Sequence, residues 1–223
     1  MDEADLFATV RERLFTAVLG DVMDANGLTR QFLPPEIRAL DAGMVVVGRA
    51  MPVLEQDIVG EPSGAPKAEP FGLMFRALDD LKADEVYLAS GASPSYALWG
   101  EMMSTRAKKL GAAGAVVDGF HRDTRGILSL GFPTFSRGAY AQDQKLRGRV
   151  VDFRCTLAFG NGAAVRPGDL IVGDVDGVLV VPREHIVDMV RLALEKVLGE
   201  GHVRSLIESG EATQAVFDKT GIM

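Results

Sequence analysis

An arginine and an aspartate are adjacent at Arg122-Asp123, a few residues after an apolar segment that is typical of a strand, Ala115–Val117. Ligands of α/β proteins bind outside the carboxyl ends of strands, which is where this pair is expected. The guanidinium can bind a carboxylate through two parallel hydrogen bonds. The aspartate can bind a hard cation such as Mg²⁺, which needs only one or two protein carboxylates and can itself chelate a 2-oxo acid. A structural alternative stays open, in which Asp123 caps a helix beginning at Thr124 and Arg122 forms a surface ion pair.

Glu101 is a second candidate, because Gly100-Glu101 lies near the start of an expected helix, where unpaired N–H groups favour anions. A carboxylate there can contact metal-bound water or act as a general base. Alternatively, Glu101 only complements the helix dipole. His121, next to Arg122, can shuttle protons, although a role behind the site or at the surface is equally open.

The elements that must position these residues alternate between strand and helix in the middle of the chain. In chain order, the patterns predict a strand at Met44–Val53, a helix at Phe71–Leu81, a strand at Glu85–Ala89, a helix at Ala97–Leu110, a strand at Ala115–Val117, a helix at Thr124–Leu130 and a strand at Pro133–Phe135. This order predicts an α/β fold, with helices packed outside β-layers in one domain spanning residues 1–223. The loop Glu55–Pro70 is rich in proline and is a candidate lid.

The two ends of the chain are expected to be helical, with a strand-rich stretch before the second. The patterns predict a helix through Leu6 and Val18, a break at Gly20-Asp21, a short helix at Val22–Asn26, a strand at Arg147–Leu157, a hairpin of Leu170–Val172 with Val178–Val181, a helix at Arg183–Leu198 and two shorter closing helices. The C-terminal helical extension therefore covers about residues 183–223.

Composition and charge exclude several classes of protein. The 223 residues are 47% hydrophobic and 25% charged, which is ordinary for a globular chain. The single cysteine, Cys155, excludes a disulfide framework or a cysteine-based zinc site within one chain, and we expect it to be a small buried residue. A net charge of −7 argues against a nucleic-acid partner. No apolar run approaches the ~18 residues of a membrane span, and the acidic N-terminus is unlike a signal peptide, so we expect a cytoplasmic protein without a membrane partner.

Other motifs favour structural roles or are missing. The sequence contains neither a phosphate-binding P-loop nor a nucleophile elbow. Its lysines lie in polar contexts that disfavour a Schiff base. Asp174 and Asp176 resemble the start of a calcium loop, but the twelfth position holds His185 instead of glutamate, so a hairpin turn is favoured. Trp99 is expected to pack in the core.

Two longer segments resemble a known family. DGFHRDTRGILSLGFPTFSRG, at 118–138, and PGDLIVGDVDGVLVVP, at 167–182, are similar to the RraA-like family, which includes 4-hydroxy-4-methyl-2-oxoglutarate/4-carboxy-4-hydroxy-2-oxoadipate aldolases. The resemblance extends from about Leu14 through the helix after Pro182. It implies a swivelling β/β/α fold and homotrimers or hexamers with sites between subunits. It also implies Mg²⁺- or Mn²⁺-dependent cleavage of 2-oxo acids to pyruvate, often with oxaloacetate decarboxylation.

The resemblance also implies roles for single residues. Asp123 would be the direct metal ligand, and Arg122 would pair with the substrate carboxylate. Glu101 would contact metal-bound water. Glu200, or else Glu195, would complete the site from a neighbouring subunit.

The backbone N–H groups of Gly100, Glu101, Met102 and Met103 would meet the pyruvyl oxygens of the substrate. The leading hypothesis is therefore a divalent-metal lyase acting on a short 2-oxo acid by retro-aldol cleavage or decarboxylation. The alternative is a non-enzymatic regulator that binds a ribonuclease or helicase. The family's regulators have an uncharged residue where this chain has Asp123, which favours the enzyme.

Overall fold

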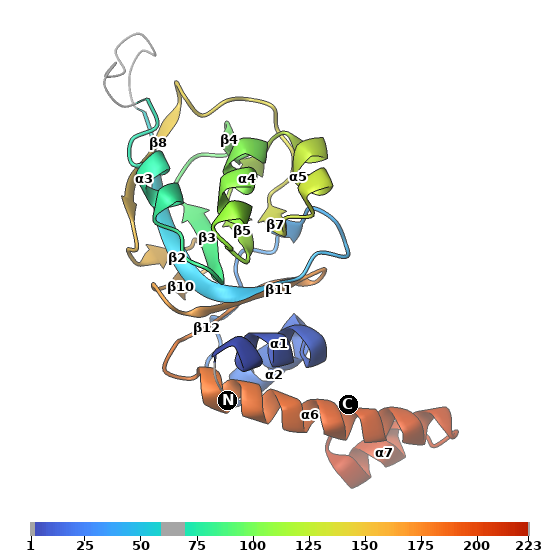
Figure 1. Ribbon diagram of the computed structural model, residues 1–223. Helices are drawn as coiled ribbons and strands as arrows, with labels where there is room; N and C mark the ends of the chain where they lie inside the picture. Colours follow the sequence, from blue (N-terminus) through green and yellow to red (C-terminus); the bar gives the residue numbers. More distant parts are fainter. Residues whose placement is uncertain (1–2, 59–69, 223) are drawn as a thin grey trace.

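The computed structural model describes residues 3–58 and 70–222. Its centre is a curved sheet of eight strands in the order β1-β7-β5-β3-β2-β11-β12, with β8 paired to β2 (Figure 1). The strands of this sheet are β1 (Arg38–Ala39), β2 (Val46–Asp57), β3 (Glu85–Ser90), β5 (Gly114–Val117), β7 (Thr134–Ser136), β8 (Gly148–Phe153), β11 (Leu170–Asp174) and β12 (Gly177–Val181). Two small pairs complete the strands: β4 (Ala97–Trp99) with β6 (Phe120–His121), and β9 (Leu157–Ala158) with β10 (Ala164–Val165).

The long strand β2 causes the curvature. Its 12 residues pair with β11 at the start, with β3 along the middle and with β8 at the end. The register with β8 shifts between Leu54 and Glu55, because β8 has one extra residue there, Val151. Strands β3, β5 and β7 continue from β2 as parallel neighbours, so their carboxyl ends meet along one edge of the sheet.

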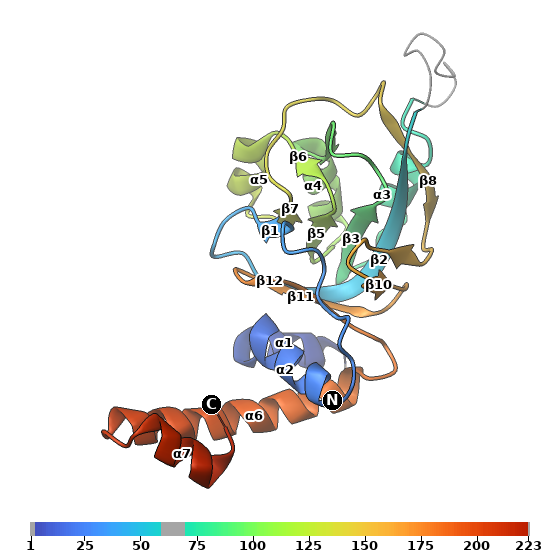
Figure 2. The same ribbon diagram turned by 180° about the vertical axis from the view of Figure 1, so that it is seen from behind.

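Helices cover the sheet in two separate groups (Figures 1 and 2). One group lies against β3 and β5, and consists of α3 (Met74–Asp79), α4 (Glu101–Lys109) and α5 (Thr124–Leu130). The other lies against β11 and β12, and consists of α1 (Glu3–Arg13), α2 (Thr16–Ala25) and the first half of α6 (Ile186–Glu208). The end of α6 projects away from the sheet together with α7 (Thr213–Thr220).

Strand β3 shows why the fold needs both layers. Tyr87 and Ala89 point toward the helices α3 to α5, whereas Val86 and Leu88 point into the concave side of the sheet. All four side chains are fully buried. A strand buried on both faces must be continuously apolar, which is the pattern of EVYLAS in the sequence.

Several predictions from the sequence are confirmed. The α/β fold class with C-terminal helices is observed, and α5 has the predicted bounds. The strands predicted at Glu85–Ala89 and Ala115–Val117 are β3 and β5. The hairpin predicted around GDVDG is formed by β11 and β12, which pair from Leu170↔Val181 to Asp174↔Gly177.

The predicted break in the N-terminal helix was wrong. The chain leaves helix α1 after Arg13 and starts α2 at Thr16, whose N–H and hydroxyl both donate to the Asp174 carboxylate, at 2.8 and 2.7 Å. This tertiary contact fixes the start of α2. Gly20 instead lies inside α2, where a Cβ would come within 2.6 Å of the Phe32 ring, so the glycine leaves space for that ring.

The helix predicted at Ala97–Leu110 begins later, because Ala97–Trp99 pairs with β6 as strand β4. Residues Glu55–Asp57, expected in a loop, belong to β2 and pair with β8. Residues 59–69 of the candidate lid lie outside the described residues. The strand predicted at Arg147–Leu157 ends at Phe153, since Arg154 adopts a left-handed backbone conformation with φ 54°.

Bounds also differ for two helices. The helix predicted at Phe71–Leu81 is shorter, Met74–Asp79. The helix predicted at Arg183–Leu198 continues to Glu208 across two glycines, so one closing helix, α7, follows in place of two. Within residues 3–58 and 70–222, no helix is long and apolar enough to span a bilayer.

Candidate functional site

Two helix starts are brought together by the small parallel pair of β4 and β6. Trp99 at the end of β4 is the register partner of His121 at the end of β6, and the Arg122 N–H donates to the Trp99 carbonyl at 2.9 Å. Each strand is followed by one or two residues and then by a helix, α4 or α5. Gly100-Glu101 therefore lies beside Arg122-Asp123, although 22 residues separate them in sequence.

Asp123 has an unusual backbone, with φ 59° and ψ 36° in the left-handed region. It precedes α5, but its side chain makes no capping hydrogen bond, so the helix-cap alternative was wrong. Its Oδ2 atom instead accepts a long bond of 3.4 Å from the Glu101 N–H, at the start of α4. The side chain is 44% exposed. Aspartate is one of the residues that adopt this region most readily, and here the conformation directs the carboxylate toward Gly100-Glu101 at the start of α4.

Gly100 is required by this close approach. A Cβ at position 100 would lie 2.9 Å from Asp123 Oδ2, in the space through which the carboxylate reaches α4. The backbone of Gly100 itself is extended, so the requirement is for space and not for an unusual φ.

Arg122 forms ion pairs with two carboxylates. Its Nη1 lies 3.0 Å from Asp143 Oδ1, and its Nε lies 3.7 Å from Asp123 Oδ2. The Arg122 side chain is 40% exposed, so it stays open to a further anionic partner. The ion-pair alternative for Arg122 is thus observed, and it does not exclude the binding role.

Glu101 lies in the first turn of α4, but its side chain points toward α5. A Cβ at Gly126 would come within 2.3 Å of the Glu101 carboxylate, so the glycine provides the space for it. From this position the Glu101 carboxylate can still interact favourably with the helix dipole at the start of α4. The Glu101 N–H can at the same time donate to Asp123 Oδ2. Its role in proton transfer stays a prediction.

A hollow of about 310 Å³ lies in front of these residues, at the carboxyl edge of the parallel strands. Its lining includes Gly100, Met102, Met103, Arg122 and Asp123, all expected from the sequence. Sequence analysis missed the rest of the lining, which has no motif: Phe71, Met74, Phe75, Leu78, Ala97, Leu98, Asp143 and Gln144, together with Trp99, which was expected only in the core. The hollow therefore combines a charged side with an apolar side.

A buried carboxyl group lies behind the hollow. Glu55 is 1% exposed, and its Oε2 accepts a 2.7 Å hydrogen bond from the Gln144 amide, a lining residue. Burial raises the pKa of Glu55 to about 8, against a smaller lowering by the Gln144 bond. Within the described residues, its Oε1 and the buried Tyr87 hydroxyl have no hydrogen-bond partner. A proton on Glu55 is thus the stable state at neutral pH.

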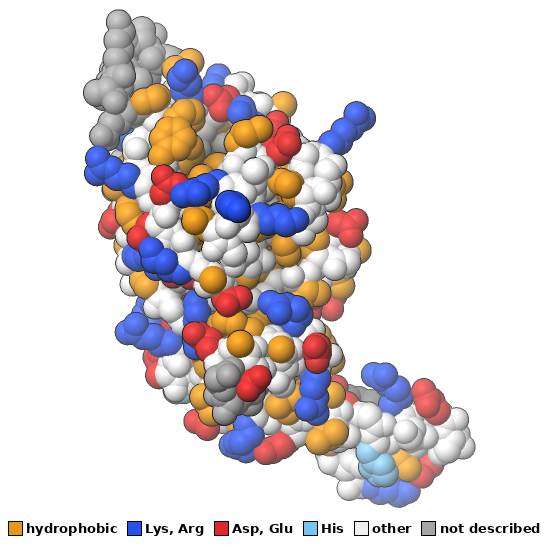
Figure 3. Space-filling model, in the orientation of Figure 1, with side chains coloured by type: hydrophobic (Ala, Val, Ile, Leu, Met, Phe, Trp, Pro, Cys, Tyr) orange, Lys and Arg blue, Asp and Glu red, His pale blue; other side chains and the backbone are white. Residues whose placement is uncertain are grey.

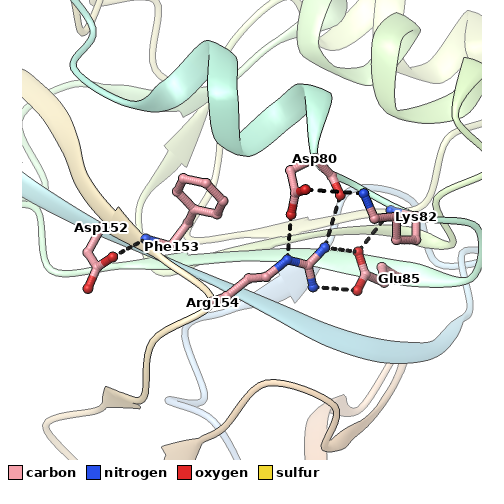
Figure 4. Close-up of polar contacts among 6 residues, drawn as sticks. All are labelled: Asp80, Lys82, Glu85, Asp152, Phe153 and Arg154. Atoms are coloured by element: carbon pink, nitrogen blue, oxygen red, sulfur yellow. Dashed lines mark hydrogen bonds and ion pairs between the residues drawn. The ribbon is translucent and has the colours of Figure 1, made fainter.

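An ion-pair cluster fixes the apolar side of the hollow (Figure 4). Arg154 donates to both carboxylate oxygens of Glu85, at 2.7 and 2.9 Å, and to the Asp80 carboxylate and carbonyl. Asp80 is the residue at the end of α3, and its hydrogen bond with Arg154 lowers the pKa of its carboxyl group. The cluster joins α3 to β3 and to the end of β8, and so positions Met74 and Leu78 on the hollow.

The other sequence candidates lie outside the hollow. His121 is 2% exposed, and its ring nitrogens contact Ser136 Oγ at 2.7 Å and Thr124 Oγ1 at 3.1 Å. Burial lowers the pKa of His121, so the neutral ring is favoured and the position behind the site fits best. Cys155 is only partly buried, in contrast to the expectation.

Glu200 lies on α6, on the far side of the sheet from α4 and α5 (Figure 1), where it pairs with Lys196 at 3.5 Å. Glu195 pairs with Arg191 at 2.8 Å on the same helix. Neither can reach Asp123 of its own chain. Their contribution from a neighbouring subunit, and assembly as a trimer or hexamer, stay predictions.

Asp123 is the residue that could hold a magnesium or manganese ion. In the part of the chain that the structure describes, no three His, Cys, Asp or Glu residues form a metal cluster. Mg²⁺ commonly binds through one or two carboxylates and keeps several waters, so it does not need such a cluster. Asp123 offers one exposed carboxylate without a capping bond, beside an arginine that can orient an anionic ligand.

Residues 16–180 match the family model RraA-like, described as Aldolase/RraA. A Halalkalibacterium halodurans protein named "Putative 4-hydroxy-4-methyl-2-oxoglutarate aldolase" is 32% identical over 221 residues, covering 98% of both chains. DlpA of Legionella pneumophila is 27% identical over 216 residues, or 95% of this chain; the chain spans 34% of the length of DlpA.

A solved structure supports the fold. Streptomyces coelicolor RraAS2, described as an unusual member of the RNase ES inhibitor RraA protein family, superimposes with a TM-score of 0.77. The alignment covers 91% of this chain and 97% of that chain, at 24% sequence identity. At this identity the similarity is informative about the fold alone.

Proposed function

Because the chain belongs to the RraA-like family, we propose that it is a divalent-metal-dependent lyase that cleaves or decarboxylates a short 2-oxo acid to give pyruvate. The observation that carries this proposal is Asp123, whose exposed carboxylate projects from a left-handed backbone beside Arg122 at the mouth of a hollow. The relative named as an aldolase supports a lyase over other enzyme classes.

The chain's own residues divide the work as follows. Arg122 binds the substrate carboxylate, and the N–H groups of Gly100–Met103 orient the pyruvyl oxygens. A cation at Asp123 would supply Lewis-acid stabilisation of the developing enolate, an effect of several kcal/mol. In a retro-aldol step a base takes the 4-hydroxyl proton, the C3–C4 bond breaks and the pyruvyl fragment keeps the electron pair. Glu101, whose side chain points toward α5 and does not line the hollow, is our candidate for that proton through an intervening water.

Metal dependence is the direct test. Purified protein is expected to release pyruvate from oxaloacetate or 4-hydroxy-4-methyl-2-oxoglutarate in the presence of Mg²⁺ or Mn²⁺. EDTA should abolish the release, and added metal should restore it. Pyruvate is measured by coupled reduction to lactate, against the spontaneous rate without protein. Release no faster than that background with every 2-oxo acid tested would refute the proposal.

Replacing Arg122 with lysine is expected to act mainly on substrate binding. Lysine keeps the charge but loses the planar fork, which is worth about 1.5–3 kcal/mol in a charged hydrogen-bonded pair. We expect KM to rise roughly 10- to 100-fold with a smaller change in kcat. Arg125→Lys, three residues along at an exposed position of α5, is the matched control and should leave KM unchanged. Equal effects of both substitutions would remove Arg122 from the substrate site.

The non-enzymatic alternative predicts another outcome. A protein that only binds a ribonuclease would give no metal-dependent pyruvate release and would co-purify with that ribonuclease in a pull-down. Asp123 favours the enzyme, because it places a carboxylate beside Arg122 on the lining of the hollow, an arrangement that a ribonuclease-binding surface does not require.

A further inference from the structure

The hollow has two sides of opposite character. Its charged side consists of Arg122, Asp123 and Asp143. Its apolar side is formed by α3 and the segment before it, with the first turn of α4; we call it the α3 wall, and it consists of Phe71, Met74, Phe75, Leu78, Met102 and Met103. Figure 3 shows hydrophobic side chains gathered on this part of the surface.

Two large apolar residues of the α3 wall are exposed, although other residues of α3 are buried in the core. The Phe75 side chain is 57% exposed and Met102 is 75% exposed, although α3 also buries Met74, Ala77 and Leu78. The Phe75 ring is held by an edge contact with Phe71, with centroids 5.4 Å apart. A fixed aromatic ring beside flexible methionines is a surface that binds apolar ligand groups well.

Charge on the opposite side limits what else can bind. Among the described lining residues Arg122 is the one cation, and it already pairs with Asp143 at 3.0 Å. A substrate with one carboxylate can use this arginine. With a cation on Asp123, a second carboxylate at C4 would still meet Asp143 or the α3 wall, where the described lining residues provide no second cationic side chain, which is unfavourable.

We propose that the substrate is a monocarboxylic 4-hydroxy-2-oxo acid whose C4 bears an apolar group, aryl or branched alkyl, that lies on the α3 wall. The inference rests on the proposed lyase function and adds the substrate class. Arg122 binds the single carboxylate at one end of the hollow, and the apolar group displaces water from the wall at the other. The hollow of about 310 Å³ suits a ligand of this small size. Cleavage releases pyruvate and an apolar aldehyde or ketone, with the hydroxyl proton passing to the base and a proton added at C3.

The test compares two substrates that differ at C4. Pyruvate release is measured from 4-hydroxy-2-oxo-4-phenylbutanoate and from the dicarboxylate 4-hydroxy-4-methyl-2-oxoglutarate with the same metal-loaded protein. We expect kcat/KM to be at least roughly tenfold higher for the phenyl substrate, the range that apolar pocket contacts provide.

Phe75→Ala should remove most of this preference, and Phe75→Arg should shift it toward the dicarboxylate. Phe217→Ala, at an exposed ring on α7, is the control and should change neither value.

The outcomes separate the two proposals. A higher kcat/KM for the dicarboxylate in the wild-type protein would overturn the substrate class while leaving the lyase intact. Release from neither substrate, nor from oxaloacetate, would instead refute the lyase itself. If Phe75→Ala changes the oligomeric state in light scattering and leaves the substrate preference unaltered, the wall is covered by a second copy of the chain and the inference is wrong. Melting temperatures of all variants are the control that each remains folded.

Discussion

Asp123→Asn is expected to lower pyruvate release by roughly 10²–10⁴-fold, the range that corresponds to several kcal/mol of lost Lewis-acid stabilisation. Asparagine keeps the volume of the side chain but lacks the anionic oxygen that a hard cation prefers. Metal affinity, measured by calorimetry with Mn²⁺, should fall together with turnover. The two losses have one cause, so they should appear in the same variant.

The same substitution should leave the stability of the fold unchanged. Asp123 makes no capping bond that asparagine could lose, and its side chain is 44% exposed. Asparagine also tolerates the left-handed conformation of this position. Thermal unfolding of the variant should therefore coincide with that of the wild-type protein within about 0.5 kcal/mol.

A matched control exists elsewhere in the chain. Asp84 has a nearly identical left-handed backbone, with φ 61°, but is exposed and lies outside the lining of the hollow. Asp84→Asn applies the same chemical change to the same backbone geometry, and it should retain full turnover and metal affinity. If Asp123→Asn also retains wild-type turnover, the metal ligand is wrongly assigned and the lyase loses its main support.

The parts of the fold that local patterns determine could be predicted from the sequence. Strand β5 is a short apolar run bounded by turn residues, and α5 begins and ends at residues with clear boundary signals. Ala97–Trp99 was assigned to a helix because nothing local distinguishes it from the start of α4. Its strand conformation depends on pairing with β6, a partner more than 20 residues away.

The candidate site divides in the same way. Arg122 and Asp123 were found because they are adjacent and follow a strand. Asp143 and Phe75 reach the hollow from segments about 20 residues downstream and nearly 50 upstream of Asp123, and no spacing rule connects them to it. Glu55 was missed because its proline-rich surroundings indicated a loop. Only the pairing of the end of β2 with β8 buries this carboxyl group behind Gln144.

That buried carboxyl group leads to a large expected effect on stability. Its pKa is about 8 in the folded protein and near 4.5 in the unfolded chain. Between these values the folded protein holds a proton that the unfolded chain has released, so the free energy of unfolding falls as pH rises. The loss is about 1.4 kcal/mol per pH unit and reaches up to about 4 kcal/mol near pH 8.

Glu55→Gln should remove this loss, because glutamine resembles the protonated acid and its carbonyl oxygen can still accept from Gln144. Near pH 5 the variant and the wild-type protein should unfold at similar temperatures. At pH 8 the variant should be more stable, by about 2–4 °C for each kcal/mol recovered.

Glu12→Gln, at an exposed position of α1, is the control and should give no pH-dependent difference. Glu55 bonds the Gln144 amide and interacts with the Tyr87 and Tyr96 hydroxyls, whose pKa values are raised by burial, while the pKa of the nearby Asp57 is lowered. Glu55 is therefore the group among them that titrates in this range. A stability difference between Glu55→Gln and wild type that stays constant from pH 5 to 9 would show that Glu55 is ionised in the folded protein throughout.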